Sequence, residues 1–339
     1  MSHSLKWAWI GSIGLAILAT VALLTLRPFV EGVTFAPDQG FNWYYWKRPD
    51  PDAWSRASMW GGYVLHQLFL WGVIAWAQTN RDRLRERGKI HVINWIALGG
   101  TGFFVALHYV QTALFYDGLG QDLPVITSQG SVVLVLVVVL IMEAPRRGLF
   151  FGRAKLFRGI RQSLIRYHGY YFAWAVTFTY WYHPMELTAG HLAGFFYTFL
   201  LFIQAAFIFT RVHTNRWWTF ALEGAVLIHG VIVALVAGQD FWTMFLFGFL
   251  VILVVTQMHG LGLKRWIRWA IGLGAVASIL WVYRGEDWGA QFGLQWGGEG
   301  GRGWGAVHEV LRIPVIDYVL VFMIAGLVLL LQKVLRKAS

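Results

Sequence analysis

Long runs of apolar residues alternate with short polar segments along the whole chain. Each run covers about 15 to 25 residues, and an α-helix of about 20 residues crosses the roughly 30 Å hydrocarbon core of a bilayer. The pattern therefore predicts an all-α polytopic membrane protein in which residues 1–339 form a single transmembrane domain. The ten helices that we expect cover residues 7–26, 58–79, 91–115, 129–143, 168–183, 190–210, 217–237, 241–258, 266–283 and 314–332.

Basic residues divide the polar segments into two sides. With the N-terminus placed in the cytoplasm, the inner side holds 21 of the 28 lysines and arginines, chiefly in the loops 80–90 and 144–167. The outer side, with its longer loops 27–57 and 284–313, holds the other seven. Cytoplasmic segments of membrane proteins are enriched in Lys and Arg. We therefore predict that both termini are cytoplasmic and that the protein lies in a bacterial inner (plasma) membrane.

Composition agrees with a membrane protein and excludes several functions. Hydrophobic residues make up 57% of the chain and charged residues 13%, whereas soluble domains contain about 25% charged residues. The formal charge of +11 follows from the basic inner loops, which are expected to contact anionic membrane lipids, so it does not indicate a nucleic-acid partner. The chain has no cysteine, which excludes disulfides, thiolate metal ligands and iron–sulfur clusters.

The segment from Arg166 to Trp218 has the pattern of a transmembrane hairpin. Two apolar runs are joined by a short turn, HPMELTAGH at residues 183–191, which carries two histidines and a carboxylate. Basic residues stand at the far ends of both runs, so we expect the turn on the outer side of the membrane. Glu186 and His183 are the candidates for acid–base catalysis at this tip.

Three further histidines are predicted to lie inside the membrane at one depth. His66, His108 and His229 each lie seven or eight residues from the outer end of a different predicted helix, which places them about 10–12 Å below the outer surface. An ionisable residue in hydrocarbon is costly and normally faces a cavity or a partner. Without cysteine, imidazole and carboxylate are the available ligands for iron, copper or zinc, and histidine also binds haem iron. We therefore predict a transition-metal or haem site formed by these histidines together with His191 and His183.

These observations predict a membrane-embedded, metal- or haem-dependent enzyme that acts on an apolar or lipid-like substrate. An oxidoreductase is the first choice, and a metal-assisted hydrolase or acyltransferase is the second. The chain has no phosphate-loop or dinucleotide motif, so use of ATP or NAD(P) by this chain alone is not expected. A redox partner or other membrane subunits are therefore the expected partners. The alternative is a non-enzymatic subunit or transporter. Its outer-half histidines would line a polar path or hydrogen-bond one helix to another.

Overall fold

The computed structural model describes residues 1–40, 43–236, 242–284 and 304–338. These residues form helices and loops without a strand, and ten of their helices have 14 residues or more. The ten are α1 (His3–Ala22), α3 (Ala53–Thr79), α4 (Val92–Phe115), α5 (Val125–Arg147), α6 (Arg158–Tyr182), α7 (Ala189–Ala206), α8 (Arg216–Val236), α9 (Trp242–Val255), α10 (Arg265–Tyr283) and α11 (Arg312–Ala338). The shorter segments are η1 (Leu23–Leu26), α2 (Arg27–Val30), η2 (Arg81–Leu84), η3 (Leu119–Gln121), η4 (Gln257–Gly260) and η6 (Trp304–Leu311).

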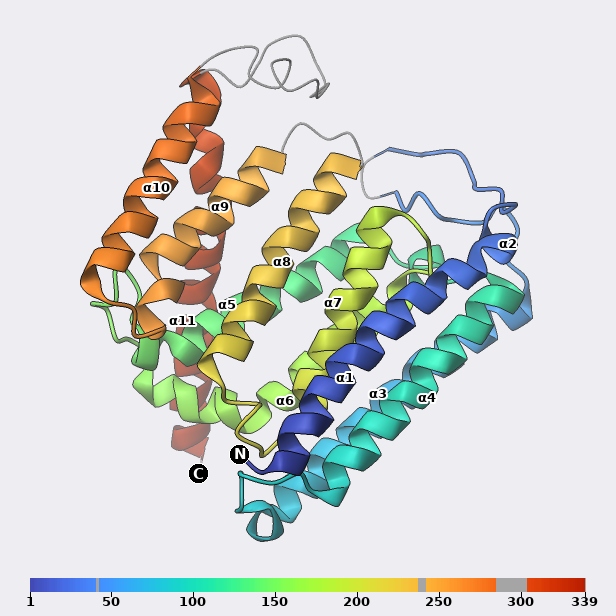
Figure 1. The fold of residues 1–339 in the computed structure, drawn as a ribbon, viewed down its shortest axis with the longest axis horizontal. Coiled ribbons are helices and arrows are strands. Elements are labelled where there is room, and N and C mark those ends of the chain that lie inside the picture. Colours follow the sequence, from blue (N-terminus) through green and yellow to red (C-terminus); the bar gives the residue numbers. More distant parts are fainter. Residues whose placement is uncertain (41–42, 237–241, 285–303, 339) are drawn as a thin grey trace. The chain divides into compact units, whose positions relative to one another are not determined.

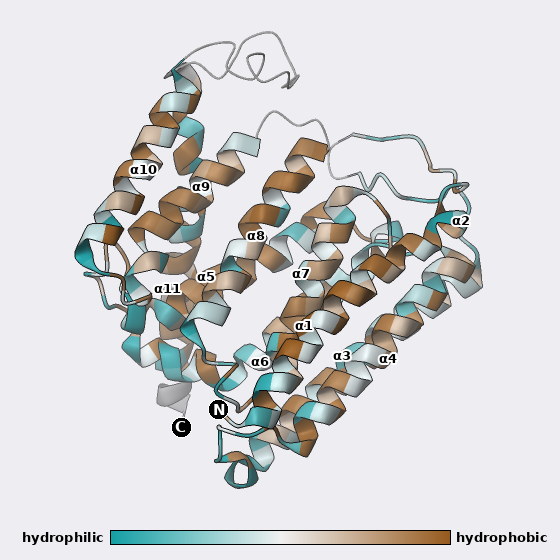
Figure 2. Ribbon diagram, viewed as in Figure 1, coloured by the Kyte–Doolittle hydropathy of each residue, from teal (hydrophilic) through white to brown (hydrophobic). Residues whose placement is uncertain are grey.

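The helices have the length and apolar character of membrane spans. By length and composition, eight helical segments of the described chain could cross a membrane, whereas α3 and α6 are long but less apolar. Apolar residues dominate the middle of most helices (Figure 2). Large apolar side chains on the helix surfaces are exposed, among them Leu15 at 66%, Phe103 at 62% and Leu114 at 67%. So much exposed apolar surface would be unfavourable in water. The chain is therefore a helical integral membrane protein.

Each predicted helix has a counterpart, but several helices extend beyond their predicted ends, α6 by the most. Helices α5 and α6 extend into the predicted inner loop 144–167 and leave only residues 148–157 outside a helix. Arginine is a good helix former, so the basic ends of both helices remain helical. Gly148, at a φ of 73°, follows the end of α5.

The predicted outer loops differ from one another. In the loop 27–57, α2 lengthens the first helix and the Asp52 side chain caps α3 by accepting from the Ser55 N–H at 2.7 Å. Of the loop 284–313, residues 285–303 lie outside the described residues.

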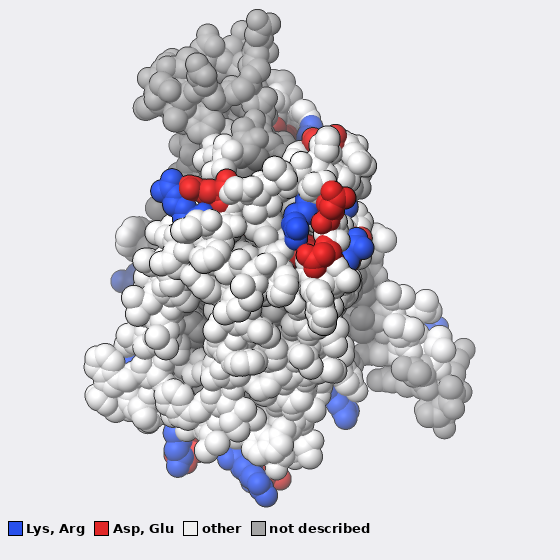
Figure 3. All heavy atoms as spheres, turned by 90° about the vertical axis from the view of Figure 1, so that its right-hand side faces the viewer, with Lys and Arg blue, Asp and Glu red and all other residues white. Residues whose placement is uncertain are grey.

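By its internal contacts the chain divides into two compact units. The first contains residues 1–135 and 167–222, and the second contains residues 136–166 and 223–339. In the first unit α4 packs against α3 and α7, and α7 packs against α1 (Figure 1). On the face drawn in Figure 3, charged side chains gather near the upper and lower edges, and a broad middle band is almost free of them.

Segments far apart in sequence meet at one end of the first unit. The Ser2 N–H donates to the Gly88 carbonyl at 2.7 Å, and the Arg211 N–H donates to the Arg87 carbonyl at 2.8 Å. The N-terminus, the segment between α3 and α4 and the segment after α7 therefore lie together. The sequence assigned these three segments to the same side of the membrane.

The second unit contains a buried ion pair. Arg147 on α5 donates through both terminal nitrogens to the Glu223 carboxylate on α8, at 2.6 and 2.5 Å. The Arg147 side chain is only 4% exposed. Its charge is compensated by the bidentate geometry and by Glu143, which lies 3.4 Å away.

The core of the first unit is aromatic, and one glycine decides how closely two of its helices approach. Trp181 on α6 is fully buried, and its ring lies over Gly62 on α3. A Cβ at Gly62 would lie 2.2 Å from the ring, whereas a Cβ at the neighbouring Gly61 would meet nothing within 4 Å.

We predict that Gly62→Ala destabilises the protein and that Gly61→Ala does not. The first substitution overpacks the core by forcing Trp181 to move, which costs about 1–3 kcal/mol. The second stabilises α3 by about 0.5–1 kcal/mol because alanine loses less backbone entropy than glycine. Melting temperatures of the two variants in detergent test the pair, and equal shifts would show that Trp181 does not pack on this face.

Candidate functional site

The turn between α6 and α7 is anchored to the buried C-terminal part of α4. The His108 ring donates through Nε2 to the main-chain carbonyl of His183 at 3.0 Å, since a carbonyl can only accept. The Met185 N–H donates to the Thr112 hydroxyl at 3.0 Å. Gly118 allows the chain beyond α4 to approach, because a Cβ there would lie 2.5 Å from the Tyr182 carbonyl oxygen. The turn thus has a fixed place against α4.

Two side-chain atoms converge on a single ring nitrogen at this turn. His183 Nδ1 lies 3.0 Å from the Tyr44 hydroxyl and 3.2 Å from His191 Nε2. A ring nitrogen has either one lone pair or one N–H, so it can make one well-directed hydrogen bond at a time. The other nitrogen of His191 lies 2.8 Å from the Thr188 hydroxyl, which also caps α7. Both histidines are half-buried.

Aromatic residues of the long loop before α3 enclose this pair of histidines. Tyr44 is 2% exposed, and the Trp46 ring contacts that of His191 edge-on at 4.4 Å between centroids. Burial, and then the nearby Tyr182, Glu186 and Asp117, raise the pKa of Tyr44 well above its usual value. Its hydroxyl therefore keeps its proton at neutral pH unless a cation displaces it.

A second set of polar groups lies beside the histidines. The Tyr116 hydroxyl donates to the Glu186 carboxylate, and the Leu187 N–H donates to the same group at 3.2 Å. Burial and the charge of Glu186 raise the pKa of Tyr116, so it stays a donor. Glu186 is 8% exposed and is held by these two donors.

Asp117 is the other buried carboxylate at this end of the unit, at 2% exposure. It accepts from the Ser55 hydroxyl and, at 2.8 Å, from the Gly118 N–H. Burial, and to a smaller extent the charge of Asp122, raise the pKa of Asp117. The hydrogen bonds from Ser55 and Gly118 and the charge of Arg48 oppose this rise without cancelling it.

The deeper histidines have different surroundings. His66 is fully buried, stacks on Phe104 at 4.4 Å and accepts at Nδ1 from the Trp181 indole N–H at 3.3 Å. Because an indole N–H can only donate, a neutral His66 carries its proton on Nε2. His108 is also fully buried, and its bond to the His183 carbonyl leaves the lone pair on Nδ1.

The structure brings four of the predicted ligands into the first unit. His66, His108, His183 and His191 belong to it, whereas His229 lies on α8 in the second unit. Within the described residues, no group of three His, Asp or Glu side chains is arranged to hold a metal ion. The site formed by His66, His108 and His229 therefore stays a prediction.

Sequence reasoning missed Tyr44, Thr188 and Tyr116 as members of the site. Tyr44 comes from a loop more than 130 residues away from His183 in sequence, and its contact distance depends on tertiary packing. The run of aromatic residues at 43–46 was the available signal, but Trp and Tyr are common at membrane interfaces, so the run did not distinguish Tyr44 from its neighbours.

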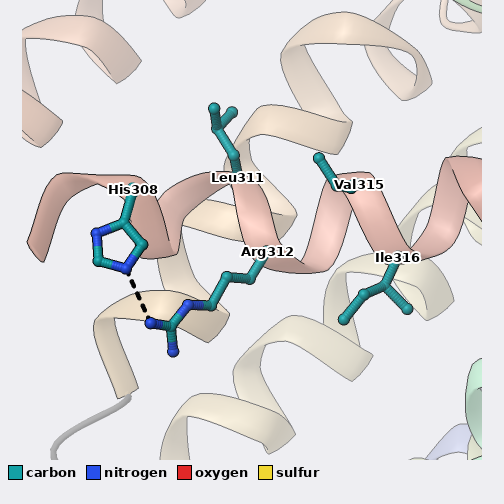
Figure 4. Close-up of a pocket in the computed structure, with 5 residues that line it drawn as sticks. All are labelled: His308, Leu311, Arg312, Val315 and Ile316. Carbon is teal, nitrogen blue, oxygen red and sulfur yellow. Dashed lines mark hydrogen bonds between the residues drawn. The ribbon is translucent and has the colours of Figure 1, made fainter.

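A shallow pocket of about 350 Å³ lies in the second unit, at the start of α11 (Figure 4). Its lining residues are His308, Leu311, Arg312, Val315 and Ile316. All five are exposed and come from one stretch of chain, and Arg312 donates to His308 Nε2 at 2.9 Å. The pocket offers no convergence of groups from several elements, so the tip of the α6–α7 hairpin is the stronger candidate.

Comparison with known proteins gives no relative. No protein family matches the chain, and neither a curated protein nor a solved structure matches it. The functional argument therefore depends on the geometry of the site.

We predict that Asp117→Asn changes how stability depends on pH. A carboxyl whose pKa is raised by folding contributes stability fully below its unfolded pKa of about 3.9, and this contribution is lost as the pH rises through the folded pKa. Asparagine does not titrate, so the wild type should lose stability relative to the variant as the pH rises above about 4.

Melting temperatures of both proteins across this pH range measure the effect. Asp50→Asn, at an exposed position in the loop before α3, controls for the general effect of removing one carboxylate. A difference between Asp117→Asn and wild type that does not change with pH would contradict the raised pKa.

Proposed function

We propose that this protein is a membrane-embedded metalloenzyme whose metal ion is held at the hairpin tip by His183, His191 and Tyr44. The observation that carries the proposal is the convergence of the Tyr44 hydroxyl and His191 Nε2 on His183 Nδ1, at 3.0 and 3.2 Å. His183 Nδ1 can form a hydrogen bond with only one of these two groups at a time. A cation, in contrast, would bind the lone pairs of His183 Nδ1, His191 Nε2 and the Tyr44 oxygen together.

The distances agree with ligands of one ion. Two atoms that each lie about 2.1 Å from a metal, at an angle between about 90° and 110°, are about 3.0–3.4 Å apart. The separations of 3.0 and 3.2 Å fall within that range. Axial ligands of haem lie on opposite sides of the iron, with nitrogens about 4 Å apart, so this pair suits a non-haem ion better.

The surroundings of the ligands also support a metal. A metal-bound histidine usually donates its other ring N–H to an oxygen, and the Thr188 hydroxyl is placed to accept from His191 Nδ1 at 2.8 Å. Nitrogen and phenolic oxygen donors suit iron, copper or zinc. Both histidines are half-buried, so the centre could be reached by a substrate.

The reaction that we propose is oxidation or reduction of an apolar or lipid-like substrate at the outer membrane surface. A bound iron or copper ion would supply the electron chemistry, and Glu186, held by Tyr116, would exchange the proton. A zinc ion would instead favour metal-assisted hydrolysis or acyl transfer with the same Glu186 as base. A redox partner or another membrane subunit would supply the electrons for a reduction of the substrate, or accept them in an oxidation.

We further propose ten membrane spans with both termini in the cytoplasm of a bacterial cell. The placement rests on the 21 basic residues of one side against seven on the other. It puts the candidate metal centre on the outer side.

The chain allows a direct test of this topology because it contains no cysteine. We expect a membrane-impermeant thiol reagent to label Asp50→Cys in intact cells and to leave Arg85→Cys unlabelled until the membrane is permeabilised. Both positions are exposed, so access within the protein does not decide the result. Labelling of Arg85→Cys alone in intact cells would reverse the proposed orientation.

The metal centre is tested by loading purified protein with iron, copper or zinc and measuring metal per chain. We expect His183→Ala, His191→Ala and Tyr44→Phe each to weaken metal binding by at least about tenfold. Tyr45→Phe is the matched control for Tyr44→Phe, because Tyr45 is the next residue and is 55% exposed. His3→Ala, at an exposed histidine, controls for loss of any imidazole.

Other outcomes would redirect or end the proposal. A Soret band in the purified protein would indicate haem instead of a single ion. Loss of metal in His66→Ala and His108→Ala, with full binding in His183→Ala and His191→Ala, would place the metal at the deeper histidines. Wild-type protein that binds none of the three metals would end the metalloenzyme proposal.

A further inference from the structure

Buried polar atoms without hydrogen-bond partners are concentrated in one region of the first unit. Among the described residues, twelve buried side-chain nitrogen or oxygen atoms make no hydrogen bond, and eight of these belong to α3, α4 and α6 of this unit. The side chains that carry the eight atoms are His66, Gln67, Thr101, His108, Gln111 and Thr177. None of the six is more than 7% exposed.

The six side chains come from three helices, and the two histidines among them share packing partners on α6. His66 and His108 both pack against Tyr180, at 6.0 and 4.9 Å between ring centroids, and both contact Trp181. Thr101, His108 and Gln111 are seven and three residues apart on α4, which places them on one face of that helix.

The two histidines leave complementary groups unpaired. The Trp181 indole fixes the proton of His66 on Nε2, so a donor is left without a partner there. The bond from His108 Nε2 to the His183 carbonyl leaves an acceptor without a partner at Nδ1. The amides of Gln67 and Gln111 each add an unpaired donor and an unpaired acceptor.

A dry interior of this kind would not be stable. Each buried donor or acceptor without a partner carries a desolvation penalty, and eight such penalties together are comparable with the whole free energy of unfolding of an ordinary domain. Native proteins leave very few such atoms, and ordered water usually fills the role of the missing partner.

We propose that buried water molecules hydrate this region between α3, α4 and α6. A buried water makes about three hydrogen bonds, so at least about three molecules are needed to satisfy the eight atoms. A water molecule can accept from the N–H of His66 and donate to the lone pair of His108, so water suits both of these groups. Through His108 the water would be connected to the main chain of the hairpin tip, independently of any metal there.

Replacing each glutamine by leucine separates a hydrated site from a dry one by the sign of the effect. If Gln67 and Gln111 bind water, Gln67→Leu and Gln111→Leu should each lower the melting temperature by about 2–4 °C. If the amides are unpaired in a dry core, the apolar replacement removes their penalty and raises the melting temperature.

Gln204→Leu sets the scale of these shifts. The Gln204 amide donates to the His213 carbonyl at 3.0 Å and accepts from the Trp218 indole at 2.8 Å, so its loss must be destabilising. Shifts of the same sign for all three variants support the hydration site. A rise for either Gln67→Leu or Gln111→Leu overturns it.

A second measurement detects the water itself and does not depend on how the variants fold. In solid-state NMR of the wild-type protein in bilayers, magnetisation from water should reach the ring nitrogens of His66 and His108, both with the proton on Nε2. Exposed His3 is the positive control. Transfer to His3 without transfer to His66 and His108 overturns the proposal.

Discussion

The main-chain turn between α6 and α7 is held by two side chains of α4, and the geometry of the candidate site depends on this anchorage. His108 donates to the His183 carbonyl and Thr112 accepts from the Met185 N–H. An unpaired backbone group in apolar surroundings costs several kcal/mol, so the turn has little freedom to move away from α4. The direction of the His183 ring, and therefore its approach to His191, follows from this constraint.

Polarity inside the first unit serves helix association. Lipid tails are as apolar as the side chains of a membrane helix, so helices associate through close packing and hydrogen bonds. The aromatic core around Trp181 supplies the close packing, and Gly62 and Gly118 allow the nearest approaches. Helix α3 is less apolar partly for the same reason, because its polar residues His66 and Gln67 are buried in protein, whereas Arg158, Gln162 and Arg166 at the start of α6 are exposed.

The two units differ in the groups that stabilise their buried charges. In the second unit, Arg147 and Glu223 form a bidentate ion pair with Glu143 nearby, and each charge is compensated. In the first unit, the buried carboxylates Asp117 and Glu186 lie at one end and accept from hydroxyl and main-chain donors. The interior between its helices contains the neutral groups histidine, glutamine and threonine, which water can satisfy.

The sequence by itself determined that the chain is a helical membrane protein, because apolar run length and charge distribution are local properties that set which segments can cross a bilayer. It also indicated the hairpin tip and its His183, Glu186 and His191. Only the tertiary structure placed Tyr44 against His183 and divided the histidines between two units. A contact between residues 44 and 183 depends on how the helices pack. The depth of a histidine in the membrane can be counted along its own helix, but that count does not show which helices lie next to each other.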